Sequence, residues 1–296
     1  MNKPLLPALG LVLNALVWGL SWWPFRELQS QGLHPLWATA AVFAVAWLGL
    51  MLVYPRAWQH LKTHPELFWL MAASGLTNVG FNWAVTTGDV VRVVLLFYLM
   101  PTWALLLAWW LLKERPTRGA LARMGLALAG VVLVLKTPDT PWPIPQDLPD
   151  VLALLAGMCF ALTNILLLRL QHTPDATRMV AMFGGGGLMA FACASLATVT
   201  GIVPEIAITA SEASGWAPWV LGLSVAFLVS NFALQYGAAR LTAHTTAMLM
   251  MSEVVFASVS SVAAGASVLT WRLGLGGGMI VLAALLASQT HTKPTD

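Results

Sequence analysis

Long apolar stretches, separated by short breaks that hold charged, proline or glycine residues, occupy almost the whole chain. A helix that crosses about 30 Å of hydrocarbon needs about 20 consecutive apolar residues. Stretches of that length occur ten times and predict ten transmembrane helices. The predicted spans are about 5–25, 35–54, 67–87, 90–112, 118–136, 149–169, 179–200, 216–237, 242–264 and 271–289.

Two amide pairs interrupt this apolar pattern at corresponding places. Asn78 and Asn82 are four residues apart in the third span, and Asn231 and Gln235 repeat that spacing 153 residues later. Side chains at i and i+4 share one face of a helix, so each pair marks a polar face. The same offset superposes further residues: Trp83 on Tyr236, Pro101 on Val254 and Gly125 on Gly278.

The repeated pattern predicts a duplicated chain. A first five-helix repeat would occupy residues 1–137 and a second would occupy 149–296, joined by the proline-rich linker 138–148. Because each repeat holds an odd number of spans, the two would lie in opposite orientations. The predicted fold is therefore an all-α, polytopic membrane protein with ten transmembrane helices, arranged as two inverted five-helix repeats.

Composition supports a lipid environment. The chain has 296 residues, of which 58% are hydrophobic and 9% are charged, whereas soluble domains carry about 25% charged residues. So few charges cannot cover a water-soluble particle of this size. The two cysteines, Cys159 and Cys193, lie in apolar stretches and predict neither a disulfide framework nor a metal site.

The distribution of Lys and Arg predicts the orientation. With the amino terminus inside, eleven of these residues fall in inner segments and four in outer ones, which accounts for all fifteen. Cytoplasmic loops are enriched in Lys and Arg. We expect a multi-pass protein of the inner (cytoplasmic) membrane with both termini cytoplasmic.

Glu253 is the one acidic side chain near the middle of a predicted span, and the repeat offset places Met100 at the equivalent position. A carboxylate there costs about 2.5–3.5 kcal/mol on insertion scales, so it should face a cavity or a partner. It could couple transport to protons, anchor a substrate amine, or clamp two helices together as a structural hydrogen-bonding group.

The residues that carry a family resemblance lie mostly in the first half of the chain. The stretch Leu96-Phe97-Tyr98-Leu99-Met100-Pro101, then Leu111-Leu112-Lys113-Glu114-Arg115, then Gly125 to Gly130 resembles the EamA-type ten-helix members of the drug/metabolite transporter (DMT) superfamily. Val17-Trp18-Gly19 is similar to that family's first-helix signature. The chain departs from the family pattern in its second span, which has no arginine, and near Ser267, where the second closing glutamate is replaced. The resemblance implies export or exchange of small metabolites.

Candidate substrate-binding residues combine the repeated amides with aromatic residues on helices that, by the resemblance, line the cavity. The amides can donate and accept hydrogen bonds, either to substrate or between helices. The aromatic rings could stack on a substrate or simply pack. The candidates are Trp18, Asn78, Asn82, Trp83, Tyr98, Asn164, Asn231, Gln235 and Tyr236.

Arg92, just after Asp89, has two interpretations. It could snorkel to water beside that aspartate at the membrane interface, or form an outer gate that attracts anionic groups. Pro101 removes a helical hydrogen bond and predicts a kink. Gly274 and Gly278 form a GxxxG pair, which favours either a homodimer or an internal helix contact.

The function predicted is a secondary transporter, and more specifically an exporter, of small metabolites such as amino acids by alternating access. No G-x-x-x-x-G-K-[ST] motif is present, so ATP is not expected as the direct energy source. We expect a small-molecule substrate and the lipid bilayer as partners, with proton coupling and a homodimer left open, and neither a cofactor, a metal nor nucleic acid. The alternatives are a membrane enzyme using His60, His64 and Glu66 on a lipid-linked substrate, and a non-transporting scaffold.

Overall fold

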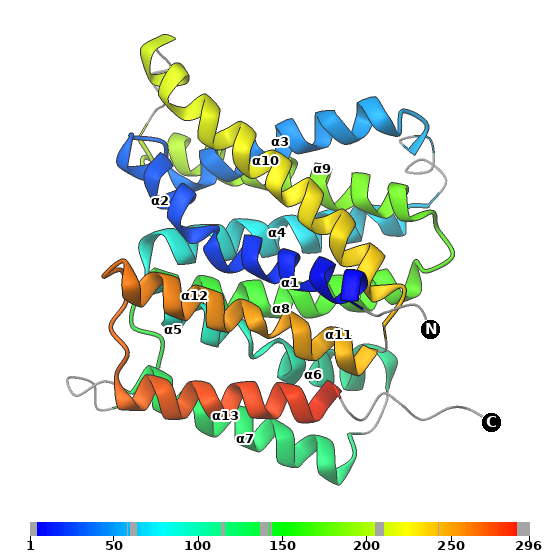
Figure 1. The fold of residues 1–296 in the computed structure, drawn as a ribbon, viewed down its shortest axis with the longest axis vertical. Helices are drawn as coiled ribbons and strands as arrows, with labels where there is room; N and C mark the ends of the chain where they lie inside the picture. Colours follow the sequence, from blue (N-terminus) through cyan, green and yellow to red (C-terminus); the bar gives the residue numbers. More distant parts are fainter. Residues whose placement is uncertain are drawn as a thin grey trace.

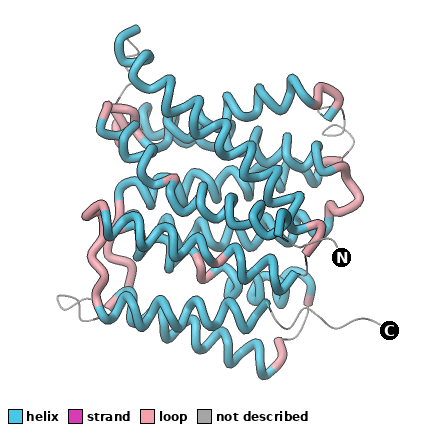
Figure 2. Tube along the Cα trace, viewed as in Figure 1, coloured by secondary structure: helices cyan, strands magenta, loops and turns pink. Residues whose placement is uncertain are grey.

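The computed structural model is built of helices (Figures 1 and 2). It describes residues 5–57, 59, 64–113, 116–136, 142, 144–204, 210–241 and 243–288, and within these ranges it contains thirteen helices and no strand. The helices are α1 (Leu5–Leu20), α2 (Trp22–Ser30), α3 (Pro35–Val53), α4 (Glu66–Thr87), α5 (Val90–Phe97), α6 (Met100–Leu112), α7 (Arg118–Leu135), α8 (Leu148–Arg169), α9 (Asp175–Val199), α10 (Ala210–Ala238), α11 (Ala243–Met250), α12 (Ser252–Ala263) and α13 (Trp271–Ser288).

The predicted apolar segments are all helical where they are described. Three of them are divided into two consecutive helices: α1 with α2, α5 with α6, and α11 with α12. Among the described residues, seven segments are long and apolar enough to cross a membrane. Figure 1 shows the helices lying side by side as a bundle, with both chain ends at the same end of it. The molecule is therefore a polytopic helical membrane protein.

The outward-facing sides of these helices are apolar. Leu52 on α3 and Val199 on α9 are 85% and 86% exposed, and many other large hydrophobic side chains are exposed beside them. Water would disfavour such a surface, whereas hydrocarbon chains accommodate it.

Polar side chains cap several helices at their first turn. The side chain of Asp89 accepts from the backbone N–H of Arg92 at the start of α5, and Asp147 does the same for Asp150 at the start of α8. These caps satisfy N–H groups that have no partner within the helix.

Glycines allow the closest contacts between helices. Gly75 on α4 lies against the backbone of Gly185 on α9, and Gly130 on α7 lies against that of Gly276 on α13. An added Cβ at any of these positions would collide with the opposing helix. Without a hydrophobic driving force between helices in lipid, such small-residue contacts contribute much of the packing attraction.

Helix contacts between the two halves of the chain are reciprocal. α1 packs against α10, α11 and α12, whereas α8 packs against α4, α5 and α6. The first helix of each half thus packs against the third span and the divided fourth span of the other half. The two halves of the chain therefore interlock.

Candidate substrate and coupling site

Two interrupted helices occupy equivalent positions in the two halves. α5 ends at Phe97 and α6 begins at Met100, whereas α11 ends at Met250 and α12 begins at Ser252. Tyr98 and Met251, which lie in the two interruptions, are separated by the offset of 153 residues found in the sequence. The backbone stays close to helical geometry at both places: the N–H of Tyr98 donates to the carbonyl oxygen of Val94, and that of Val254 donates to the carbonyl oxygen of Met251. The kink predicted at Pro101 is in fact a break just before it, with the proline in the first turn of α6.

The interruptions meet through Tyr98 and Glu253. The Tyr98 hydroxyl lies 3.0 Å from Oε2 of Glu253 and 3.3 Å from the carbonyl oxygen of Met250, and it can donate to either. Tyr98 and Glu253 are 3% and 7% exposed. Glu253 also stands in the first turn of α12, where the helix dipole favours negative charge. One buried carboxylate is therefore held between the two discontinuous helices.

Aromatic side chains surround this contact. Trp18 on α1 stacks on Phe227 of α10 with ring centroids 4.4 Å apart. Phe97, next to Tyr98, lies 4.8 Å from Phe81 on α4 and 5.4 Å from Phe160 on α8. The polar contact between the half-helices is thus set among apolar rings contributed by four other spans of the bundle.

The first amide pair connects α4 to its surroundings. Asn82 is fully buried, and its Nδ2 donates to Oγ1 of Thr39 on α3 over 3.2 Å. Its Oδ1 has no partner among the described residues. Asn78 is half-buried and donates to the carbonyl oxygen of Ser74 on its own helix. In this conformation Asn82 joins two helices, and Asn78 keeps its amide oxygen for other contacts.

The second amide pair is arranged differently. Nε2 of Gln235 donates to Oδ1 of Asn231 over 3.0 Å, so the two half-buried side chains bind each other. Tyr236 is 39% exposed and lies under the guanidinium group of Arg240. Asn164 on α8 is exposed.

The structure brings together only some of the predicted residues. Tyr98 and Glu253 form a direct contact, and Trp18 lies among the aromatic residues packed around that region. Trp83 lies near the C-terminal end of α4, where the centroid of its ring is 5.2 Å from that of the His34 ring.

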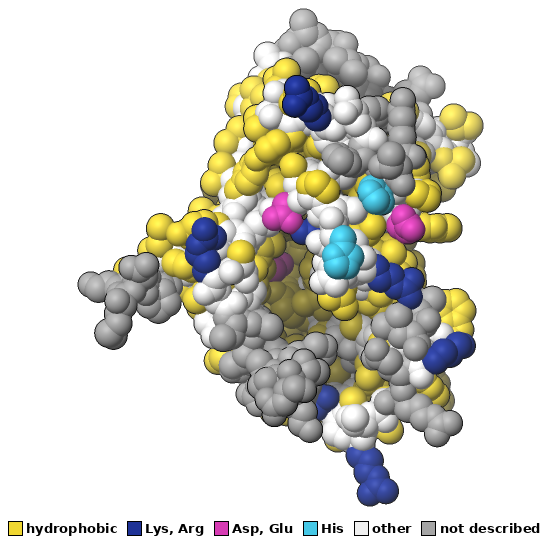
Figure 3. Space-filling model, turned by 90° about the vertical axis from the view of Figure 1, so that its right-hand side faces the viewer, with side chains coloured by type: hydrophobic (Ala, Val, Ile, Leu, Met, Phe, Trp, Pro, Cys, Tyr) yellow, Lys and Arg dark blue, Asp and Glu magenta, His cyan; other side chains and the backbone are white. Residues whose placement is uncertain are grey.

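The end of the molecule that carries both termini is hollowed. Figure 3 views this end, after a quarter turn from Figure 1, and shows a depression at the centre whose walls are mainly hydrophobic. A few charged and histidine side chains stand around its rim. The centre of the bundle is thus approached from this end.

At the opposite end of the bundle, an ion pair that sequence reasoning missed joins α5 to α8. Nε and Nη2 of Arg92 each lie 2.7 Å from one carboxylate oxygen of Asp150, and Nη1 donates to the carbonyl oxygen of Val134. Asp150 is 1% exposed. The prediction that Arg92 snorkels to water beside Asp89 is wrong, because the guanidinium group turns inward to a carboxylate 58 residues away. Asp150 gives only a helix-start signal in the sequence.

Two further contacts hold the same end together. Nε of Arg26 on α2 donates to the carbonyl oxygen of Thr86, and Nη2 donates to that of Gly88, at the end of α4. The N–H of Val91 on α5 donates to Oγ of Ser267, which follows α12, over 3.3 Å. α5 also packs against α12. Elements of both halves are therefore bound to each other at the end away from the termini.

Within the described residues, no group of three His, Cys, Asp or Glu side chains could hold a metal ion. His60, Glu114, Arg115 and the linker residues 138–141 and 143 lie outside the described residues.

Comparison with known proteins bears on the first half and on the overall fold. Residues 5–136 match the EamA-like transporter family. A protein of Pseudomonas aeruginosa named as an uncharacterized transporter is 28% identical over 134 residues, a stretch that covers 43% of this chain and 45% of that protein. One similar crystal structure carries a description that names no particular protein. It aligns with 97% of this chain and 99% of its own chain, with a TM-score of 0.58 and 17% sequence identity. That likeness shows a shared fold over nearly the full length.

Proposed function

We propose that this chain, whose residues 5–136 match the EamA-like transporter family, is a secondary transporter that exports small metabolites across the inner membrane. Amino acids are the leading substrate class. The observation that carries the proposal is the contact between Tyr98 and Glu253, because it joins the two interrupted helices at equivalent positions in the two halves. Transporters with internal repeats commonly bind substrate where such half-helices meet.

The proposed architecture is ten transmembrane spans in two inverted repeats, residues 1–137 and 149–296, joined by the linker 138–148. Two facts support it. The interruptions of α5/α6 and α11/α12 are 153 residues apart, and the contacts of α1 with the second half mirror those of α8 with the first. An inverted repeat allows the two halves to exchange conformations, which opens the central site to each side in turn.

The chemistry at the interruptions suits an amphipathic substrate with an amine and a carboxylate. The carboxylate of Glu253 would attract the amine, and the N-terminal end of α6 would favour a negatively charged group. The rings of Phe97 and Trp18 offer an apolar surface for a side chain. Asn78, Asn164, Asn231 and Gln235 would supply further hydrogen bonds along the approach to this site.

Glu253 would also couple transport to protons. The carboxylate can hold a substrate amine or a proton, and binding of one would displace the other. Exchange of this kind returns a proton inward for each molecule exported. The Tyr98 hydroxyl would position the carboxylate in the substrate-free state.

In the proposed orientation both termini are cytoplasmic, and the excess of Lys and Arg on that side supports it. The hollow seen in Figure 3 would then face the cytoplasm, so that an exporter in this conformation is ready to receive its substrate. Gly274 and Gly278 on α13 have open space around them, which leaves that face available for a homodimer.

The experiment that tests this function is uptake of labelled amino acids into proteoliposomes, with and without a pH gradient, for the natural chain and Glu253→Gln. We expect saturable uptake that responds to the gradient in the natural chain and loses that response in the variant. Glu66→Gln is the matched control because Glu66 is exposed at the start of α4, and it should behave as the natural chain does. Absence of uptake for every amino acid would exclude that substrate class. A gradient response retained in Glu253→Gln would exclude the coupling role.

A further inference from the structure

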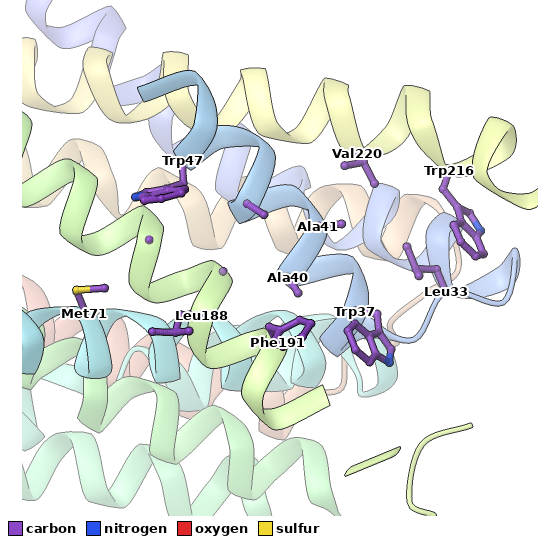
Figure 4. Close-up of a pocket in the computed structure, with 13 residues that line it drawn as sticks. Leu33, Trp37, Ala40, Ala41, Trp47, Met71, Leu188, Phe191, Trp216 and Val220 are labelled. Atoms are coloured by element: carbon purple, nitrogen blue, oxygen red, sulfur yellow. The ribbon is translucent and has the colours of Figure 1, made fainter. Parts of the chain in front are cut away.

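An apolar groove of about 570 Å³ runs along α3 between α9 and α10, away from the contact of Tyr98 with Glu253 (Figure 4). Trp47 and Met71 lie toward one end of it, and Leu33, Trp37 and Trp216 lie at the other. Every residue that lines it is apolar, a tryptophan or a glycine, and no charged side chain is among them. α3, α9 and α10 all belong to segments apolar enough to span the membrane, so the groove lies at hydrocarbon depth.

The length of the groove corresponds to one leaflet. Trp37 and Trp47 are ten residues apart on α3, which at 1.5 Å per residue gives about 15 Å. Half of a hydrocarbon core about 30 Å thick is also about 15 Å. Trp37 is near the first turn of α3, at the depth where tryptophan favours the membrane interface, and Trp47 is near the middle of the bilayer. The groove thus extends from the headgroup boundary to the midplane.

Small residues give the groove its floor and one wall. Gly184 and Gly187 of α9 bring backbone to its surface, and Ala40, Ala41 and Ala44 of α3 line the side between the two tryptophans. Because the floor and this wall carry only short side chains, an extended hydrocarbon chain can lie along α3 between the two tryptophans.

One polar atom at the interfacial end lacks a partner. Nε1 of Trp37 is buried and has no acceptor among the described residues, whereas Nε1 of the neighbouring Trp216 donates to the carbonyl oxygen of Gln31. An unpaired buried donor is unfavourable. Ester oxygens of a lipid would lie at this depth and could accept from it after a small rotation of the ring.

We propose that this groove binds one acyl chain of a membrane phospholipid from the leaflet at which α3 begins. The chain would enter beside Trp37 and end near Trp47 and Met71. Because no charged side chain lines the groove, recognition is through the hydrocarbon chain and does not distinguish zwitterionic from anionic headgroups.

A substitution that fills the groove tests the proposal. Ala44→Trp places a large ring in the groove from an exposed position of α3, and Leu48→Trp adds the same ring one turn further along, where Leu48 is 56% exposed and does not line the groove. Each protein is incubated with phosphatidylcholine or phosphatidylglycerol, washed in detergent and analysed by native mass spectrometry. We expect one retained phospholipid on the natural chain and on Leu48→Trp, equally for both lipids, and loss of that lipid from Ala44→Trp.

Three results would contradict the proposal or assign the groove to another occupant. Equal retention in both variants would overturn the proposal, as would a strong preference for phosphatidylglycerol. A lipid-free dimer that becomes a monomer only in Ala44→Trp would assign the groove to a second copy of the chain.

A second measurement uses the natural chain and so does not depend on folding of the variant. Phosphatidylcholine with a photoreactive diazirine at the end of one acyl chain should label the Trp47 and Met71 end. The same group placed near the headgroup should label Trp37 and Phe191. Labelling confined to other helices, or identical for the two probes, would exclude the proposed placement.

Discussion

His34 shows how one side chain can make stability depend on pH. Its Nδ1 accepts from the backbone N–H of Leu36 at the start of α3, and its ring meets the edge of Trp83. Partial burial lowers the pKa of His34 below its usual 6.5. The folded protein therefore prefers the neutral ring, and a protonated Nδ1 could no longer accept the hydrogen bond.

The predicted pH dependence follows from this preference. Stability should be complete above about pH 6.5, the pKa of an unperturbed histidine, and should fall as pH decreases toward the lower pKa of the folded state. Thermal unfolding in detergent between pH 5 and 8 measures it. His34→Asn should retain a cap and lose this pH dependence, whereas His34→Ala should be less stable by about 1 kcal/mol at neutral pH. An unchanged pH profile in His34→Asn would contradict the assignment.

At this scale the sequence predicts polar positions better than it predicts partners. The four-residue spacing of Asn78 and Asn82 correctly indicated a polar face of one helix. Asn82 nevertheless binds Thr39, and Arg92 binds Asp150. Those partners are 43 and 58 residues away, and their proximity results from packing of helices that local spacing does not encode.

The ion pair of Arg92 and Asp150 operates at the scale of elements, because it binds α5, α7 and α8 to each other. Asp150→Asn would leave a buried guanidinium group without its counter-charge, and such losses are about 3–5 kcal/mol. Asp175→Asn is the control, since Asp175 pairs with Arg178 at the surface and its loss should be about 0–1 kcal/mol. Thermal unfolding of both variants in one detergent gives the comparison. Equal decreases in melting temperature would show that the buried ion pair stabilises the protein no more than the surface pair does.

The contact of α4 with α9 predicts a contrast between two glycines. A Cβ at Gly185 would collide with the backbone of Met71, whereas a Cβ at Gly222 on α10 meets nothing within 4 Å. Gly185→Ala should lower stability by about 1–3 kcal/mol through overpacking. Gly222→Ala should be neutral or stabilising by up to about 1 kcal/mol, because alanine favours helix. Thermal unfolding distinguishes them, and a neutral Gly185→Ala would mean that the helices separate readily here.

The apolar stretches predicted where the helices lie, but the sequence predicted only one of the two helix interruptions. Pro101 signalled a disturbance in the fourth span, and the helix indeed breaks just before it. The equivalent break at Met251 has no proline, since the residue at the matching position is Val254. The sequence around Met251 carries no comparable signal.

At the scale of the whole molecule, the proposed alternating access would require the end away from the termini to separate during each cycle. In this conformation the N–H of Val91 donates to Oγ of Ser267, which links α5 of the first half to the segment after α12 in the second. A covalent link at this place should arrest transport. We therefore consider Val91→Cys together with Ser267→Cys, in a background where Cys159 and Cys193 are replaced by alanine.

Oxidation of the double variant should form a disulfide, stop substrate uptake into proteoliposomes and leave substrate binding from the hollowed end intact. Reduction should restore uptake. Each single variant, treated with the same oxidant, should transport normally, which separates crosslinking from damage by oxidation. If the fully crosslinked protein still transports, the two halves do not part here, and the molecule moves its substrate without opening this end.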